Sequence, residues 1–505
     1  MTQEASVLDK LVPLEPLDLA KCFTVNDIVT GMSKCSFGAR MLGEAADTLS
    51  GWSELSRKNG RSVVISDISC NNPLRDLLRT MVREFDFDGP YTTTNFLDSA
   101  GTAENVLVVG PYNEYDSEAL YGKCGRMLFV NDRYQCRPGQ VRDGHFPDVV
   151  FGNESIVLPI LHLALMERLR DKRPRVADLL QLIQEGVTVT KDHIPYGMVA
   201  KEMIHGAHTL YKMLADEDST NMFTVSGAMT VGKMQLLVAD LIDTGRIKYV
   251  AATGALMAHG LIEGSGCKHY KYDPSVSDEV LASLGLNRVT DSLEPETNFD
   301  HIEEIVSAVL DGYGSFRMRC SHEFYHDIGR YIVEHYPDAR SILASTYHRD
   351  VPIVTPAFID SELGNDVFVH NRKRLMEPSR KLVFDSEMDT EVLFKLATTA
   401  KRLGIFTIGG GVPRNNTQNV APLHEIYLNR LGIDGKPCIF HYGVRIDPAE
   451  MAPGGLSGCT YDEGVSWHKF TPGGPRAQIK SDATIVWPFM QRFALEKLGF
   501  YKAAA

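Results

Sequence analysis

Hydrophobic positions after residue 195 fall into short apolar runs that alternate with amphipathic segments. The runs are typical of buried strands, and in the segments between them apolar residues recur every three or four positions, as on one face of a helix. The predicted strands are NMFTVSG, IKYVAATGA, VPIVTPAF, IFTIGGG and CIFHYGVRI, and the predicted helices are KMQLLVADLIDTG, HIEEIVSAVLDGY, EVLFKLATTAKRLG and VAPLHEIYLNRLG. This alternation predicts an α/β fold built on a parallel sheet.

The first 195 residues follow a different pattern. The pattern along residues 1–52 predicts an extended arm and a first helix, KCSFGARMLGEAADTL. Residues 53–195 contain short strand-like pieces (RSVVISDI, NVLVVGPY and GRMLFVND) between polar loops, followed by amphipathic helices near 154–171 and 176–185. We therefore divide the chain into 1–52, an inserted α+β subdomain at 53–195, and the main α/β domain at 196–505.

Composition narrows the class of protein. A chain of 505 residues with 44% hydrophobic side chains predicts a globular protein of more than one domain. The formal net charge of −13 disfavours nucleic acid as a partner and is compatible with cationic substrates. Nine scattered cysteines without a CxxC pair favour a reducing compartment, and the sequence shows neither a signal peptide nor an apolar run long enough for a membrane span. A cytoplasmic protein with no membrane partner is the expectation.

Glycine-rich turns follow several of the predicted strands. The turns SGAM, TGAL, DSELGN and GGGVPR all fall where ligands bind in parallel α/β folds, beyond the carboxyl ends of the strands. Gly227 to Lys233 has the spacing of a phosphate loop, but Met234 stands where Ser or Thr should hold magnesium. An NTP-hydrolysing site is thus disfavoured, whereas backbone amides of this turn could still bind a cofactor phosphate.

The sequence HEFYH matches the HExxH pattern of zinc hydrolases at His322, Glu323 and His326. Residue 332, where a longer zinc pattern would place a third histidine, is isoleucine. We interpret the segment as the start of a helix, capped by Ser321, with solvent-facing histidines. No metal site is predicted.

The stretch DEGVSWHK carries the most informative chemistry. Lys469 next to Trp467 and His468, in a segment of low charge, could have a depressed pKa and act as an amine nucleophile. Glu463 could hold a cationic substrate or move a proton. A surface lysine near a packed tryptophan remains the alternative interpretation of these residues.

Taken together, the segments resemble those of deoxyhypusine synthases and their homospermidine-forming relatives. The matching segments are FGARMLGEAADTL, SGAM, TGALMAHGLIE with HYKYDP, VPIVTPAFIDSELGNDVFVH, FTIGGGVPRNN, SGCTYDEGVSWHK and SDATIVWP. They occur in family order over about residues 20–50 and 196–498, and on them the chain is identified as a member of this family. Residues 53–195 lie outside the resemblance.

The resemblance implies a Rossmann-like parallel sheet with helices on both faces, in a catalytic domain (196–505) that binds NAD. It implies small cationic polyamines as substrates, and a homotetramer or homodimer with active sites at subunit interfaces. In the implied reaction NAD takes hydride from the carbon beside a polyamine nitrogen. An aminobutyl group then passes to an enzyme lysine as a Schiff base and on to an acceptor amine, and NADH reduces the final imine.

Carried over position by position, the resemblance makes Lys469 the Schiff-base lysine, and Glu463 and Trp467 the carboxylate and indole that line the polyamine tunnel. Asp360 matches the acidic residue that follows the strand ending in Pro-Ala. The positions that fall on cofactor-binding stretches are Ser226, Gly227, Ala228, Thr253, Gly254, His259, Gly410, Gly411, Asp447, Asp482 and Ala483.

Three positions depart from the deoxyhypusine synthase pattern. Asn365 and Asn415 replace an Asp–His pair of the catalytic site, and Leu456 replaces an aspartate that anchors the polyamine. Because Asn cannot take a proton at neutral pH, another group must be the base or the amine must arrive neutral.

The segments GGGVPRN and GGLSGCTY resemble the bacterial branch of the family, which makes homospermidine from putrescine. A homospermidine synthase is the leading hypothesis. Transfer to a lysine of a translation factor and a non-catalytic regulatory paralogue are the alternatives, and the retained Lys469 argues against the paralogue.

Overall fold

The computed structural model describes residues 10–58, 60–66, 73–92, 95–96, 103–110, 124–130, 148–150, 152–188, 196–313, 317–373, 382–450 and 453–502. The chain divides into two compact units. Unit 1 comprises Met1–Asp18 and His208–Gln478, and unit 2 comprises Leu19–Ala207 and Ile479–Ala505.

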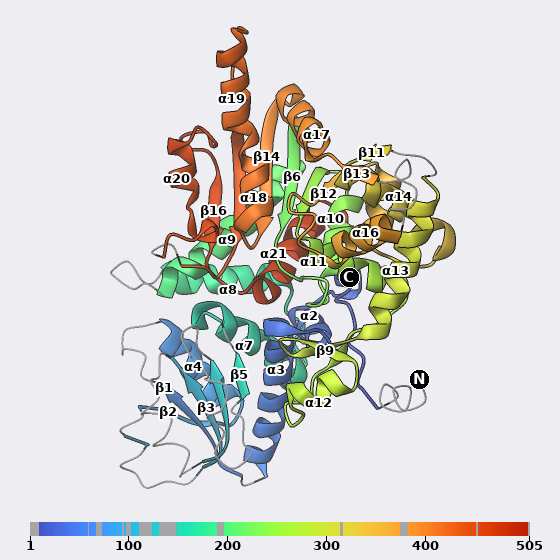
Figure 1. The fold of residues 1–505 in the computed structure, drawn as a ribbon. Helices are drawn as coiled ribbons and strands as arrows, with labels where there is room; N and C mark the ends of the chain where they lie inside the picture. Colours follow the sequence, from blue (N-terminus) through green and yellow to red (C-terminus); the bar gives the residue numbers. More distant parts are fainter. Residues whose placement is uncertain are drawn as a thin grey trace. The chain divides into compact units, whose positions relative to one another are not determined.

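A six-stranded sheet organises unit 1, with the strand order β12-β7-β6-β14-β15-β16 (Figure 1). The pairs from β12 to β15 are parallel. Renumbered in chain order, this is the arrangement 3-2-1-4-5-6 of dinucleotide-binding folds. The strands are β6 (Ser219–Val225), β7 (Ile247–Ala252), β12 (Ile353–Val354), β14 (Arg402–Ile408), β15 (Phe440–Ile446) and β16 (Arg476–Ile479).

Apolar side chains on these strands form the core of unit 1. In the register of the two central strands, Met222 on β6 lies opposite Ile405 on β14, and both are buried in one cluster with Phe440 on β15. On the same strand pair, the rings of Phe223 and Phe406 stack at a centroid distance of 5.2 Å. Burial of nearly continuous apolar runs is what a parallel sheet covered on both faces requires.

Helices and short strands surround this sheet and confirm the predicted α/β fold. The helices of unit 1 are α10 (Gln235–Asp243), α11 (Gly254–Gly264), α12 (Asp278–Ser283), α13 (Glu296–Asp311), α14 (Ser321–His335), α15 (Ile342–Arg349), α16 (Glu362–Lys373), α17 (Ser386–Thr399), α18 (Gly411–Gln418), α19 (Val420–Leu431) and α20 (Tyr461–Ser466). The short strands are β8 (Tyr270–Lys271), β9 (Leu286–Val289), β10 (Ser292–Pro295), β11 (Arg317–Arg319) and β13 (Leu382–Phe384). Helix α9 (Tyr196–Ala215) runs across the boundary between the units at residue 208.

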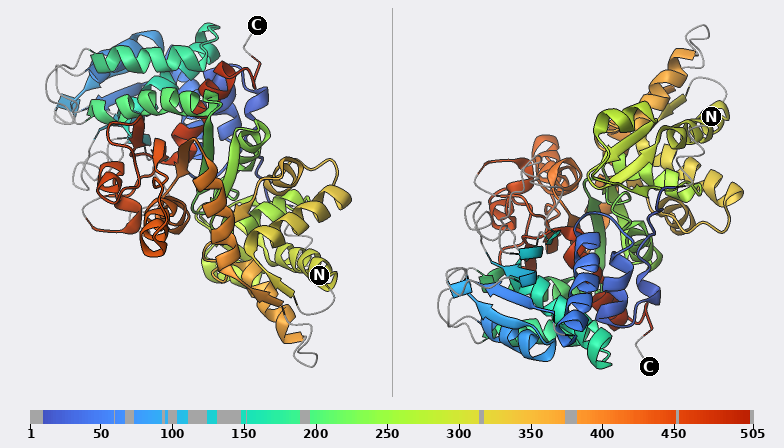
Figure 2. Two further views of the ribbon diagram at one scale, coloured as in Figure 1. Left: turned by 90° about the horizontal axis from the view of Figure 1, so that it is seen from above. Right: turned by 90° about the horizontal axis from the view of Figure 1, so that it is seen from below.

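Unit 2 contains a second parallel sheet, with the strand order β2-β1-β3-β4-β5. Figure 2 shows the strands of this sheet, in blue to cyan, from two further directions. All four strand pairs are parallel, so the inserted segment is α/β and not the α+β subdomain expected from the sequence. The strands are β1 (Ser62–Ser66), β2 (Asp88–Tyr91), β3 (Ala103–Val109), β4 (Cys124–Val130) and β5 (Asp148–Val150).

The boundaries of unit 2 differ from those drawn on the sequence. Residue 52 lies inside α3, which ends at Arg57, and the C-terminal segment from Ile479 also belongs to unit 2. Within this unit α3 packs against α7 and α21, and the Ala39 amide donates to Thr484 Oγ1 at 3.0 Å. The helices are α2 (Val25–Met32), α3 (Phe37–Arg57), α4 (Pro73–Glu84), α7 (Glu154–Arg170), α8 (Val176–Thr188) and α21 (Ala483–Lys497).

Among the helices of the described residues, none combines the length and the apolar composition that crossing a membrane would take.

A core substitution in α7 should test whether the inserted strands and the N-terminal helices unfold together. Leu161 is fully buried in α7, which packs against α2, α3, α4 and α8. Leu161→Ala should lower the free energy of unfolding by about 2–5 kcal/mol, because the lost side chain leaves a cavity. Chemical denaturation measures this loss, and hydrogen exchange should show α3 and β3 losing protection together.

Leu55→Ala is the matched control, since Leu55 lies in α3 but is 47% exposed. It should cost less than about 1 kcal/mol. If α3 kept its protection in Leu161→Ala while β3 lost it, α3 would not belong to the same cooperative unit.

Candidate active site

Three turns of unit 1 are joined at the carboxyl ends of its central strands. Ser226 follows β6, and its amide donates to Ile408 O on β14 at 2.9 Å, while its hydroxyl donates to the carbonyl of Gly410. Thr253 follows β7, and its Oγ1 donates to Gly227 O at 2.8 Å. Because β6 and β14 are the strands at which the strand order reverses, these turns line the crevice where such folds bind ligands.

Glycines in these turns serve two different purposes. Gly227 (φ 76°) and Gly411 (φ 64°) have left-handed backbones, and a Cβ added to either would meet no atom closer than 3.8 Å. A Cβ on Gly254 would instead lie 2.1 Å from Ser361 Cβ, and one on Gly410 would lie 2.6 Å from an oxygen of Asp447. Gly254 and Gly410 thus allow close packing within the protein, whereas Gly227 and Gly411 leave open space at the turn.

Two helices begin at this edge without a side-chain cap. Helix α11 follows Thr253 and helix α18 follows Gly410, and neither of these N-cap residues accepts a hydrogen bond from its helix. The first amides of α11, and those of Gly411 and Val412 in α18, are therefore available to a ligand, and they favour an anion, whereas Pro413 has no N–H to donate. Together with the open glycines, this edge fits the phosphates of a dinucleotide.

The remaining predicted cofactor positions are distributed over both units. Ala228 O accepts from the Gly232 amide at 3.1 Å within the turn after β6, and Asp447 is buried after β15, where it pairs with Arg445 at 3.2 Å. Asp482 caps α21 in unit 2 by accepting from the Thr484 amide at 2.7 Å, and Ala483 is the first residue of that helix. A cofactor role for these four positions stays a prediction.

Two residues of the predicted phosphate-binding stretches point away from the edge into a buried network. Lys233 is fully buried and pairs with Glu263, so it does not present its ammonium group to a phosphate. His259, on α11, is also buried, with Nδ1 3.0 Å from Glu294 Oε2 and 3.1 Å from His269 Nε2. The phosphate-loop interpretation thus lacks its lysine as well as its hydroxyl residue.

Lys469 is half-buried just after α20, and its environment disfavours the ammonium form. Its Nζ donates to Asn415 Oδ1 on α18 at 3.1 Å. Burial and then the nearby positive charge of Arg414 lower the pKa of Lys469, and Cys459 and Glu463 offset this only in part. A lysine with a lowered pKa has more neutral amine at physiological pH and is a better nucleophile.

Arg414 is a site residue that the sequence analysis did not identify. It is buried, and its guanidinium donates to Cys459 O at 2.8 Å and to Leu456 O at 2.6 Å. Arg445 donates to Cys459 O as well, at 2.5 Å. The two arginines hold the segment before α20, and Arg414 at the same time places a positive charge near Lys469. In the sequence, the position of Arg414 directly before Asn415 in GGGVPRNN could have indicated that it belongs to the site.

Glu463 and Trp467 are exposed in the single chain. Glu463 lies in the first turn of α20, where its amide donates to Thr460 Oγ1 at 3.0 Å. Trp467 is 63% exposed. The carboxylate and the indole are free to contact a cationic ligand.

Asn365 and Asn415 follow strands that are not neighbours in the unit 1 sheet. Asp360 and Asn365 are exposed residues that follow β12, whereas Asn415 follows β14, and β7 and β6 lie between these strands. Within the described residues, no hydrogen bond joins the two asparagines, and the side-chain partner of Asn415 is Lys469. The structure thus joins Asn415 to Lys469, and a joint catalytic role for Asn365 and Asn415 stays a prediction.

The HExxH segment forms the start of α14, as interpreted from the sequence, but its cap is different. Asp389 accepts from the Ser321 amide at 3.0 Å and from the His322 amide at 3.1 Å, so Asp389 provides the cap assigned to Ser321. His322 Nδ1 also contacts Asp389, at 2.9 Å, and Glu323 pairs with Arg319. His326 is exposed. The Asp389 carboxylate is thereby occupied by the helix terminus.

A family model and the sequences of known relatives both indicate the deoxyhypusine synthase family. The family model "Deoxyhypusine synthase" matches residues 189–493. "Probable deoxyhypusine synthase 2" of Methanosarcina mazei is 29% identical over 309 residues, which are 61% of this chain and 86% of that protein. "Deoxyhypusine synthase-like protein" of Coxiella burnetii (strain Dugway 5J108-111) is 26% identical over 353 residues, or 69% of this chain and 95% of that protein.

Among solved structures, one described as "a putative deoxyhypusine synthase from Entamoeba histolytica" aligns over 61% of this chain and 92% of its own, with 12% identity and a TM-score of 0.41.

A new charge beside Lys469 should shift the pH at which its amine becomes reactive. In the wild-type protein, the extent to which acetic anhydride acylates Lys469, measured by mass spectrometry, should begin to rise at a pH below the ordinary lysine pKa of about 10.4. Asn415→Asp should raise the pKa of Lys469, because an adjacent carboxylate favours the ammonium form. The reactivity curve should then move to higher pH.

Asn419→Asp is the control, since it adds the same charge at an exposed residue one helical turn further along the chain. It should leave the curve nearly unchanged. If Lys469 of the wild-type protein reacted only at a pH at or above the ordinary lysine pKa, the surroundings of Lys469 would not lower its pKa.

Proposed function

Because the chain belongs to the deoxyhypusine synthase family, we propose that it is an NAD-dependent transferase that moves an aminobutyl group from a polyamine to an acceptor amine through Lys469. The observation that carries this proposal is the environment of Lys469, half-buried near Arg414 with its Nζ on the neutral amide oxygen of Asn415. The neutral amine of such a lysine can add to a substrate carbon and can later be displaced from that carbon as a leaving group.

The carboxyl edge of the unit 1 sheet would hold the cofactor. The uncapped first turns of α11 and α18 would bind the phosphates, and the open sides of Gly227 and Gly411 would admit the dinucleotide. Buried Asp447, next to Gly410, would accept hydrogen bonds from a ribose. When bound, NAD supplies reversible hydride transfer at the carbon beside the substrate nitrogen.

Lys469 would act on the oxidised substrate. Its neutral amine adds to the imine carbon, the original amine departs with a proton, and the aminobutyl group remains bound to Nζ as an imine. The acceptor amine then adds to the same carbon and releases Lys469, and the product imine that remains takes back the hydride removed in the first step. Asn415 orients Nζ by accepting one of its hydrogens and, being neutral, does not favour the ammonium form.

Glu463, Trp467 and Asp360 would bind the cationic chain of the polyamine. All three residues are exposed in a single chain. Asp360 and Asn365 follow β12, whereas Asn415, which contacts Lys469, follows β14. Strands β7 and β6 lie between β12 and β14 in the sheet. This separation supports an assembly of two or four subunits in which residues after β12 of one subunit complete the Lys469 site of another.

For the acceptor, the names of the relatives favour a protein lysine, as in deoxyhypusine synthesis. They support that reaction better than the formation of homospermidine, which the sequence analysis placed first. One observation favours the second candidate. Asn365, Asn415 and Leu456 replace two carboxylates and a histidine, and the short diamine putrescine would not need the second anchor.

Replacing the proposed nucleophile tests the covalent step. With NAD and spermidine present, borohydride should add an aminobutyl mass to the peptide that contains Lys469. Lys469→Arg should abolish this label and reduce turnover by about a hundredfold or more, because a guanidinium stays protonated and cannot form the imine. Lys436→Arg, at an exposed lysine of unit 1, should do neither. Label on another residue would overturn the assignment of Lys469.

The choice of acceptor is tested by supplying the two candidate substrate sets separately. Labelled spermidine with NAD and a translation-factor precursor should transfer label to a lysine of that protein. Putrescine with NAD alone should give little product. Homospermidine from putrescine without transfer to protein would reject deoxyhypusine synthesis in favour of the second candidate, and no product in either reaction would reject both.

A further inference from the structure

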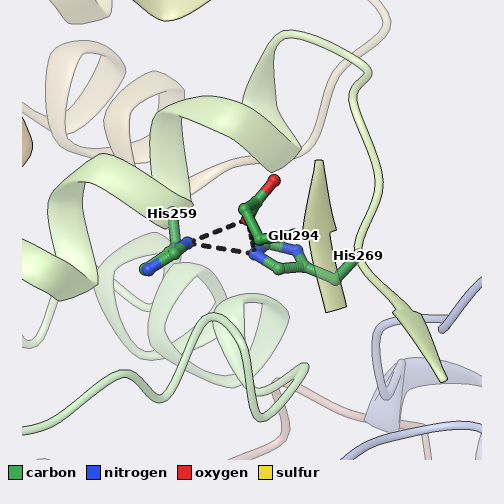
Figure 3. A group of neighbouring side chains, drawn as sticks. All are labelled: His259, His269 and Glu294. Carbon is green, nitrogen blue, oxygen red and sulfur yellow. Dashed lines mark hydrogen bonds and ion pairs between the residues drawn. The ribbon is translucent and has the colours of Figure 1, made fainter. Parts of the chain in front are cut away.

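Three buried side chains of unit 1 direct one ligand atom each toward a common point. His259 lies on α11, His269 just before β8, and Glu294 on β10 (Figure 3). His259 Nδ1 is 3.0 Å from Glu294 Oε2 and 3.1 Å from His269 Nε2, and His269 Nε2 pairs directly with the same carboxylate oxygen. All three residues are buried, so water does not screen the group.

A second layer of polar groups fixes the orientation of these side chains. His269 presents its other ring nitrogen, Nδ1, to Glu263 Oε1 at 2.6 Å. Glu263 is held in turn by Gln235 Nε2 at 3.1 Å and by Lys233, and Asn298 donates to the second oxygen of Glu294. A carboxylate behind the distal nitrogen of a histidine is the usual arrangement around histidines that bind metals.

We propose that His259, His269 and Glu294 form a binding site for a divalent transition metal of the zinc class. Two imidazoles and one carboxylate are an established ligand set for Zn²⁺. Ligands at normal zinc distances in a tetrahedral site lie about 3.3 Å apart, close to the two separations from His259 Nδ1. The His269–Glu294 pair is tighter and would open slightly around the ion. Three protein ligands leave a fourth position for water.

The competing explanation is a network of ion pairs without metal. In that state His269 is an imidazolium between Glu263 and Glu294, and with Lys233 the two positive charges balance the two carboxylates. The His259–His269 contact favours the metal. Without a metal, two N–H groups there would repel each other across 3.1 Å, and a nitrogen without hydrogen would turn its lone pair toward the carboxylate oxygen of Glu294. A cation attracts both nitrogens and the oxygen.

A second group of potential ligands in the described residues, Cys320, His322 and Asp389, is the weaker candidate. Its carboxylate already accepts from the Ser321 amide and hydroxyl, at 3.0 and 2.8 Å, and from the His322 amide. A metal there would compete with the cap of α14. At Glu294, by contrast, the hydrogen-bond donors are the two candidate imidazoles and Asn298.

Metal analysis of the full chain tests the proposal without measuring activity. Protein purified without chelator and then equilibrated with zinc should hold close to one zinc per chain by elemental mass spectrometry. Cobalt in place of zinc should give the visible bands of a four-coordinate site and no thiolate-to-cobalt charge-transfer band, because the three ligands include no sulfur.

Variants of the cluster locate the metal. His259→Gln and Glu294→Gln should each lower zinc affinity by a hundredfold or more, and Glu263→Gln by about 10–100-fold through the orientation of His269. His322→Gln, in the second group, should change neither stoichiometry nor affinity. Near-ultraviolet circular dichroism should confirm that each variant is folded. If Glu294→Gln does not fold, the zinc affinities of His259→Gln and Glu263→Gln decide whether the metal binds at this cluster.

Several results would overturn the proposal. They are a folded wild-type protein that takes up less than a tenth of one zinc per chain, a thiolate band with cobalt, or zinc binding lost in His322→Gln but kept in His259→Gln. The first result would leave the cluster as an ion-pair network. None of these results bears on Lys469, so the proposed transferase activity stands or falls separately.

Discussion

The parallel alignment of β6 with β14 is the constraint on which the rest of the site depends. These strands are the point at which the unit 1 sheet reverses its order, so the chain leaves β6 and β14 in opposite directions across the sheet. The turns after them therefore meet at one edge, where the hydroxyl of Ser226 donates to Gly410 O. Two helices begin at this edge with amides that no side chain caps.

The same alignment determines the environment of Lys469. Helix α18 starts at the edge, and it carries Arg414 and Asn415 toward the segment before α20. The buried guanidinium of Arg414 donates hydrogen bonds to backbone carbonyls before α20. Its positive charge also lowers the pKa of Lys469. One arginine therefore links the stability of the site to the reactivity of its proposed nucleophile.

Much of the fold could be predicted from the sequence, because strand–helix alternation is a local pattern. The strands IKYVAATGA and CIFHYGVRI form β7 and β15, and the turns SGAM and GGGVPR lie together at their predicted edge. The direction of the short strands in the insertion could not be predicted, because pairing depends on residues distant in the chain. For the same reason, nothing local indicated that the helix from Ala483 packs against α3.

The candidate site was predictable at the level of segments but less so at the level of side chains. Lys469 and its neighbours carry a recognisable pattern, whereas Arg414 acts through burial, which a sequence does not display. Lys233 and His259 illustrate the opposite error. Both occur in turns and helices typical of a cofactor site, yet both side chains point into one buried charged network with Glu263 and Glu294. The spacing of residues along the chain does not determine toward which side of a turn a side chain points.

The proposed cofactor site is the edge formed by β6, β7 and β14, although unit 2 contains a parallel sheet of its own. Hydrogen exchange of the full chain with and without NAD tests this most directly, because it reports on both sheets in one experiment. NAD should slow exchange in residues 226–232, 253–258 and 410–415, the turns and first helical turns of this edge. Exchange in β1, β3 and β4 should stay the same. Slower exchange confined to the unit 2 sheet, with none at the unit 1 edge, would contradict the account.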